Sequence, residues 1–75
     1  MTKKNVHLIK LGEKIREIRK IIGLSQEELA LKAGVDRSYI GGIERGERNV
    51  SLLTLIKIAS CLNCSVADFT KGIPK

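Results

Sequence analysis

Hydrophobic residues in the first third of the chain recur at steps of three and four positions. The set consists of Leu8, Leu11, Ile15, Ile18 and Ile22. This spacing gathers apolar side chains on one face of an α-helix and leaves charged residues on the other faces. Gly23 follows directly, and a glycine here ends a helix easily because it tolerates positive φ. We therefore predict a first helix from Val6 to Ile22 with one apolar stripe.

A second helix is predicted by the residues around Ser25. Ser25 and Glu28 have the S-x-x-E spacing of a capping box, in which each side chain satisfies a free backbone N–H of the other residue. The helix is expected to run to Ala33 and to end at Gly34.

Three more helices are predicted from N-cap residues and from the residues beyond each helix end. The third helix spans Arg37 to about Glu44, with Asp36 as N-cap and Gly46 after it. The last two helices are capped by Ser51, running to about Leu62, and by Ser65 with Asp68, running to about Lys71. Because alternating strand patterns are absent, the predicted class is all-α with five short helices. One domain over residues 6–72 lies between a flexible basic tail, 1–5, and a short tail, 73–75.

The segment from about 26 to 45 has the pattern of a helix-turn-helix. Ala30 is small enough to let two helices cross closely, and Gly34 suits a turn that needs positive φ. The aliphatic side chains that fill the wedge between the helices are Val35, Ile40 and Ile43. This packing holds the second helix outward, so its N-terminal residues can enter a DNA major groove.

The charge of the chain favours a polyanionic partner. Fourteen Lys and Arg against eight Asp and Glu give its 75 residues a net charge of +6. Nucleic acid is the first expectation and an acidic membrane surface the second. Membrane binding is disfavoured because the apolar stripe of the first helix is needed for the core. No long apolar run or secretory signal is present, so we expect a cytoplasmic protein.

The residues with reactive side chains do not form a recognisable site. Cys61 and Cys64 are spaced CxxC, but a zinc site needs four ligands and His7 is the lone histidine. A redox CxxC is typical of a βαβ context, which is missing. We expect two reduced, partly buried thiols, no metal and no cofactor. Without a nucleophile–base pair or a phosphate loop, an enzyme is not expected.

Several segments carry a family resemblance that covers about Leu8 to Phe69. The segments 24–30, 33–35, 39–40 and 43–46 resemble the phage repressor/Cro-type helix-turn-helix family, which implies a compact five-helix bundle of the lambda repressor-like type. Within it, 35–40 and 44–51 are most similar to the controller proteins of restriction–modification systems.

This resemblance implies a transcriptional regulator that binds a palindromic operator as a homodimer. It would control a restriction–modification operon or its own gene, and RNA polymerase is a candidate partner. Arg37 is the candidate for a bidentate contact to guanine, and Gln26 matches the position that grips the DNA backbone. The remaining expected DNA contacts are Asp36, Ser38, Tyr39, Arg45, Arg48, Asn49 and Ser51. Arg19 and Glu44 match a partly buried ion pair that braces the recognition helix.

Gly41 and Gly42 depart from the family pattern, which usually has a serine and a longer polar side chain here. Each glycine costs roughly 1 kcal/mol against alanine in a helix interior. One interpretation is a close approach of the helix backbone to DNA. We favour the second interpretation, in which the chain tolerates the loss of a base-reading side chain here and its DNA specificity rests on fewer residues such as Arg37.

The segment 50–62 is apolar on more than one helical face. We expect Leu53, Ile56 and Ala59 to line the core of the monomer. The side chains left for a dimer interface are then Leu52, Leu55, Phe69 and Ile73. The alternative function is an antitoxin-like module that binds a protein through a helix-turn-helix scaffold, although only 71–75 remain after the fold for such a contact.

Overall fold

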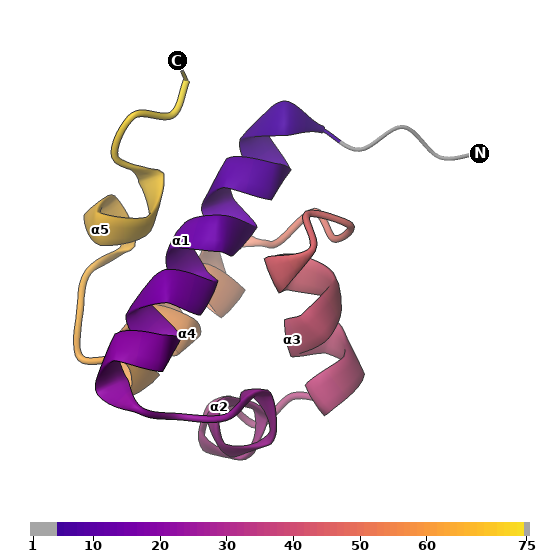
Figure 1. Cartoon of the computed structure of the whole chain (residues 1–75), viewed down its shortest axis with the longest axis vertical. Helices are drawn as coiled ribbons and strands as arrows, with labels where there is room; N and C mark the ends of the chain where they lie inside the picture. Colours follow the sequence, from indigo (N-terminus) through magenta and orange to yellow (C-terminus); the bar gives the residue numbers. More distant parts are fainter. Residues whose placement is uncertain (1–4, 75) are drawn as a thin grey trace.

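The computed structural model describes residues 5–74 and confirms an all-α fold in this range. The helices are α1 (Val6–Ile22), α2 (Gln26–Ala33), α3 (Arg37–Glu44), α4 (Leu52–Cys61) and α5 (Val66–Thr70). In Figure 1, α1 crosses the centre, α3 and α5 lie on either side of it, and α4 lies behind. The first three helices match their predicted bounds, and the last two end one residue earlier. None of the helices in residues 5–74 has the length and apolarity needed to cross a membrane.

Two residues assigned to the predicted tails, Asn5 and Ile73, take part in the folded structure. Residues 1–4 and 75 lie outside the described part of the chain. Asn5, which we assigned to the N-terminal tail, is instead the N-cap of α1, because its Oδ1 accepts hydrogen bonds from the amides of His7 and Leu8. Ile73, assigned to the C-terminal tail, packs against the core. Both residues therefore belong to the folded domain.

The core is formed by one apolar face from each helix. Ile15, Leu29 and Ile40 are fully enclosed and come from α1, α2 and α3. The other buried apolar side chains include Leu11, Ala30, Ala33, Ile43, Leu55, Ile58, Ala59, Leu62 and Phe69. The predicted stripe of α1 is correct up to Ile18, but Ile22 is 46% exposed, and the buried residue of the last turn is Arg19.

The predicted orientation of α4 is wrong. Leu53 and Ile56, expected in the core, are 76% and 49% exposed, whereas Leu55, expected at a dimer interface, is only 8% exposed. Ala59 is buried as predicted. The buried stripe is Leu55, Ile58, Ala59 and Leu62, which has the same helical spacing as the predicted one. Because α4 is apolar on several sides, periodicity alone did not distinguish the two.

Phe69 is also not available for a dimer interface. Its side chain is 1% exposed and is the largest fully buried side chain in the described residues. α5 packs against α1 and α4, and Phe69 fills the space between these elements and the core. A five-residue helix with one large aromatic side chain is stabilised mainly by burying it.

Gly12 allows α1 to lie directly on the end of α3. A Cβ atom at this position would lie 2.6 Å from the carbonyl oxygen of Glu44, a backbone atom that has no freedom to move aside. Gly46 makes a similar close approach to the backbone of Ile9 and has a positive φ of 77°. These two contacts set the distance between α1 and the end of α3.

Candidate nucleic-acid interface

The helices α2 and α3 form the predicted helix-turn-helix. Gly34 has a φ of 70°, as the turn requires, and the amide of Val35 donates to the carbonyl of Ala30. Ala30 is buried where the two helices cross, and Ile40 of α3 is fully enclosed beside it. The turn is thereby held by backbone hydrogen bonds on one side and by aliphatic packing on the other.

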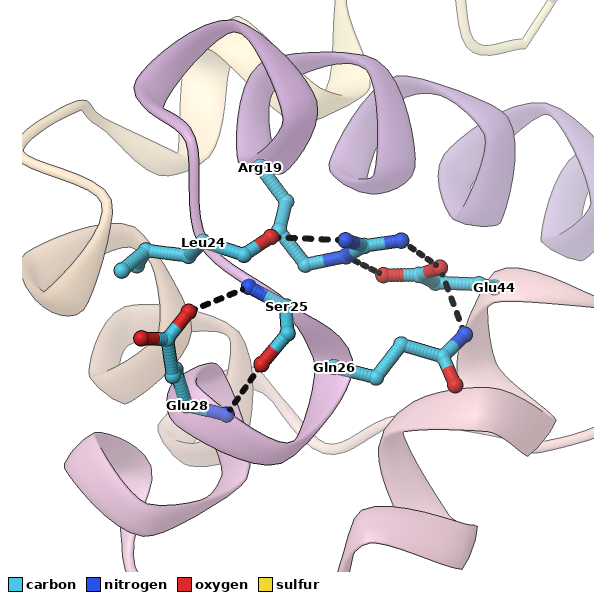
Figure 2. A network of polar contacts seen from close by, with 6 residues as sticks. All are labelled: Arg19, Leu24, Ser25, Gln26, Glu28 and Glu44. Atoms are coloured by element: carbon cyan, nitrogen blue, oxygen red, sulfur yellow. Dashed lines mark hydrogen bonds and ion pairs between the residues drawn. The ribbon is translucent and has the colours of Figure 1, made fainter.

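A buried ion pair fixes α3 to α1, which confirms the predicted pairing of Arg19 and Glu44. Arg19 Nε donates to Glu44 Oε2 at 2.7 Å and Arg19 Nη2 donates to Glu44 Oε1 at 2.9 Å. Their side chains are 8% and 3% exposed. Figure 2 shows the parallel arrangement of the two groups and the third bond, from Arg19 Nη1 to the carbonyl of Leu24. The hydrogen bond to Glu44 raises the pKa of Arg19, so the guanidinium remains charged.

Gln26 joins the same network from α2. Its Nε2 donates to Glu44 Oε1 at 2.9 Å, so a single carboxylate is bonded to side chains of both α1 and α2 (Figure 2). The sequence indicated a DNA backbone contact for Gln26 but did not reveal this bond. Gln26 lies at the first turn of α2 and is partly buried, and its bond to Glu44 uses one of the two amide hydrogens.

The N-terminal end of α3 faces solvent. Asp36, Arg37 and Ser38 are all exposed, and they are consecutive residues at the start of the helix. Asp36 occupies the predicted N-cap position, but its side chain makes no capping hydrogen bond. Its carboxylate is therefore not held against the helix end.

Tyr39 and Arg48 form a contact between α3 and the loop that follows it. The guanidinium carbon of Arg48 lies 5.5 Å from the centroid of the Tyr39 ring, within the range of a cation–π interaction. Tyr39 is partly buried and packs against the core. The structure thus gives Tyr39 a packing role in addition to its expected DNA contact.

The other expected contact residues lie in the same loop. Arg45 is exposed, and its Nε donates to Glu47 Oε1 at 3.1 Å. Asn49 is exposed. Ser51 caps α4, because its hydroxyl oxygen accepts from the amide of Thr54 and its hydroxyl donates to the Thr54 side chain. The loop therefore presents two exposed arginines after the C-terminal end of α3.

Comparison with known proteins identifies the family of this fold. The HTH_3 helix-turn-helix family matches residues 15–69, which contain α2, the turn and α3. The chain belongs to this helix-turn-helix family.

Individual members of the helix-turn-helix family are highly similar to this chain. The control protein C.SmaI of Serratia marcescens is 55% identical over 56 residues, which are 75% of this chain and 67% of that protein. The restriction–modification controller protein C.AhdI from Aeromonas hydrophila has a TM-score of 0.85 at 48% identity, over 87% of this chain and 98% of that one. The structure of SinR, the master regulator for biofilm formation, was solved in complex with DNA. It has a TM-score of 0.78 at 40% identity, over 81% of this chain and 98% of that one.

These findings confirm the resemblance found in the sequence. The family and the similarity to controller proteins are both as predicted. The class is that of DNA-binding helix-turn-helix transcriptional regulators, not of enzymes.

The two cysteines are separate from this surface. Cys61 and Cys64 are free, partly buried thiols at the end of α4, as the sequence indicated. Burial raises the pKa of Cys64, and the nearby charge of Asp68 adds to this shift. A protonated thiol is a weak nucleophile and a weak metal ligand. Among residues 5–74, no three His, Cys, Asp or Glu side chains gather as a metal site would require.

Proposed function

We propose that this protein is a sequence-specific regulator of the restriction–modification controller type, acting on DNA in the bacterial cytoplasm as a homodimer. The observation that carries the proposal is the exposed start of α3, with Arg37 and Ser38 facing solvent on a helix that a buried ion pair braces. A rigid helix with an exposed arginine suits bidentate recognition of guanine in the major groove. The structure of SinR in complex with DNA, a protein 40% identical to this chain, supports DNA as the ligand.

The contacts proposed for DNA divide into two groups. Arg37, Ser38 and Tyr39 approach base edges, since they are the first residues of α3. Phosphate contacts come from Gln26, Asn49 and the remaining loop and cap residues, namely Asp36 through its backbone, Arg45, Arg48 and Ser51. The net charge of +6 strengthens both groups by attraction to the DNA backbone.

The proposed dimer interface follows the corrected orientation of α4. Leu52, Leu53 and Ile56 are exposed on this helix, and a shallow groove of about 500 Å³ continues from Ile56 to Val66. A second copy related by a twofold axis would cover this apolar surface. The molecule measures 30 × 26 × 22 Å, a size compatible with two α3 helices about 34 Å apart, one turn of DNA.

Selection from a randomised duplex library tests this function. We expect an enriched inverted repeat whose binding weakens steeply with salt. Arg37→Ala should lose about 1–3 kcal/mol of discrimination at one base position of each half-site. Arg16→Ala is the matched control, because it removes an exposed arginine of α1 and should leave base preference unchanged. If the wild-type protein enriches no motif and heparin displaces all bound DNA, the proposal is wrong.

The regulated genes and the polymerase contact are tested separately. A methyltransferase gene and an endonuclease gene beside this gene would support the controller assignment. A regulator bound at a promoter lies next to RNA polymerase, so we include the polymerase as a proposed partner. Ternary complex formation on the selected operator, monitored by gel mobility, tests that part.

A further inference from the structure

The outward face of α3 lacks side chains at its centre. Positions 37, 38, 41, 42 and 45 share one side of the helix, opposite the buried Ile40 and Ile43. Arg37 and Ser38 occupy the beginning of this side and Arg45 its end. Between them are Gly41 and Gly42, so the helix itself offers no side chain to DNA there.

Both glycines are nevertheless covered. A Cβ atom at Gly41 would lie 3.1 Å from Nη1 of Arg45, and a Cβ atom at Gly42 would lie 3.0 Å from Cγ and 3.3 Å from Nε of Arg48. Each glycine is buried although it lies on the outer side of the helix. The neighbouring arginine side chains therefore lie across the positions that α3 leaves open.

Other contacts hold the two arginines in these places. The Tyr39 ring lies under the Arg48 guanidinium at 5.5 Å, and Glu47 accepts a hydrogen bond from Arg45 at 3.1 Å. The amide oxygen of Gln26 lies 3.6 Å from the position of a Gly41 Cβ, so it borders the same space as the Arg45 guanidinium. Two exposed arginines are thus arranged over the face of α3 before any ligand binds.

From this arrangement we infer that Gly41 and Gly42 are positioning residues. Because they lack side chains, Arg45 and Arg48 can lie over the centre of the outward face of α3 and contact the DNA there. The inference rests on the proposed function, because it assigns a role within the same DNA interface. A glycine whose role is to admit an arginine differs from one that admits the DNA backbone. If the glycine makes room for the arginine, substituting the glycine weakens DNA binding only while the arginine is present. If the glycine makes room for the DNA backbone, the substitution weakens binding with or without the arginine.

A double-mutant cycle at Gly42 and Arg48 separates these cases on the operator selected by the wild-type protein. Gly42→Gln fills the space with a long side chain that favours helix formation, and it should weaken binding about tenfold by displacing Arg48. Arg48→Ala should weaken binding by a similar factor. The double variant should bind no more weakly than Arg48→Ala alone, because no arginine remains to be displaced.

Two controls keep the test interpretable. Ile21→Gln places a glutamine at an exposed position of α1 outside the proposed DNA interface, so its affinity should stay within about twofold of wild type. Thermal melting should show that Gly42→Gln is folded at the assay temperature, since glutamine is a better helix former than glycine. A parallel cycle with Gly41→Gln and Arg45→Ala repeats the comparison one position earlier.

Three results would overturn the inference. Wild-type affinity in Gly42→Gln would show that the space over the glycine has no role in binding. If the double variant loses affinity by the product of the two single losses, Gly42 acts independently of Arg48, as a close approach of the DNA backbone would require. Failure of the wild-type protein to select any motif would reject the proposed function itself, and this inference with it.

Discussion

Arg19 and Glu44 illustrate how much a single buried pair of charges depends on its hydrogen bonds. Removing two charges from water is costly, and their attraction offsets this cost only when the remaining donors and acceptors are also satisfied. Here Leu24 and Gln26 supply the additional partners. Among residues 5–74, no buried side-chain nitrogen or oxygen lacks a hydrogen bond. The main effect of the pair is therefore to fix the position of α3. Removal of either partner would leave an unpaired buried charge, which is strongly destabilising.

Glu44→Gln should lower the free energy of unfolding by about 3 kcal/mol, because it leaves the buried guanidinium of Arg19 without a counter-charge. Urea denaturation monitored by circular dichroism measures this loss. Glu17→Gln is the matched control, since it removes the same charge from the exposed pair Lys14–Glu17. That change should cost less than about 0.5 kcal/mol. Equal, small losses in both variants would contradict the structural role of the buried pair.

Short helices depend strongly on their ends, and α2 and α5 both begin with capping boxes. The amide of Ser25 donates to Glu28 Oε1 at 2.8 Å, and that of Ser65 donates to Asp68 Oδ2 at 2.9 Å. These backbone bonds favour the ionised carboxylates and lower the pKa of both acids. A carboxyl group whose pKa is lowered by folding stabilises the folded state at neutral pH and loses that effect on protonation.

Stability should therefore fall as the pH decreases through the lowered pKa of Glu28, below its ordinary value of 4.5. Glu28→Gln keeps a carbonyl oxygen for the Ser25 amide but does not titrate. The variant should show a smaller loss of melting temperature than wild type between about pH 5 and pH 3. Glu27→Gln is the control on the same helical turn, because Glu27 does not bond the Ser25 amide. A pH dependence identical in wild type and Glu28→Gln would refute the capping role.

At the scale of the whole molecule, α4 divides its apolar side chains between the core and the surface. Leu55, Ile58, Ala59 and Leu62 are buried, while Leu52, Leu53 and Ile56 remain exposed. A small monomer with such a surface is expected to associate. Dimerisation would also double the number of DNA contacts, so the association of two chains and their affinity for an inverted repeat are expected to change together.

Ile56→Glu should give a folded monomer, because it adds a charge to the proposed interface without touching the core. Sedimentation velocity at tens of micromolar should show a dimer for wild type and a monomer for the variant, with weaker operator binding. Ile21→Glu is the matched control, since Ile21 is an equally apolar, exposed residue at the end of α1. A monomeric wild-type protein, or dimers in both variants, would show that α4 is not the interface.

The ends of the helices and the turn between α2 and α3 were predictable from short stretches of the sequence. Helix ends were readable because caps and glycines act through hydrogen bonds and φ angles of the residues beside them. The small residues of the α2–α3 turn specified the helix-turn-helix in the same way. The pairing of Arg19 with Glu44 came from the family resemblance, since nothing local joins residues so distant in the chain.

The tertiary structure decided what depends on distant surfaces. α4 has more than one apolar stripe, and only packing against α2 and α5 selected the stripe that is buried. Gln26 bonds Glu44, and Arg45 and Arg48 cover the two glycines, because folding brings α2, α3 and the following loop together. The need for glycine at position 12 likewise arises only from the packing of α1 against the end of α3. Local bonding sets where helices begin and end, whereas the choice of contacting faces is a property of the assembled core.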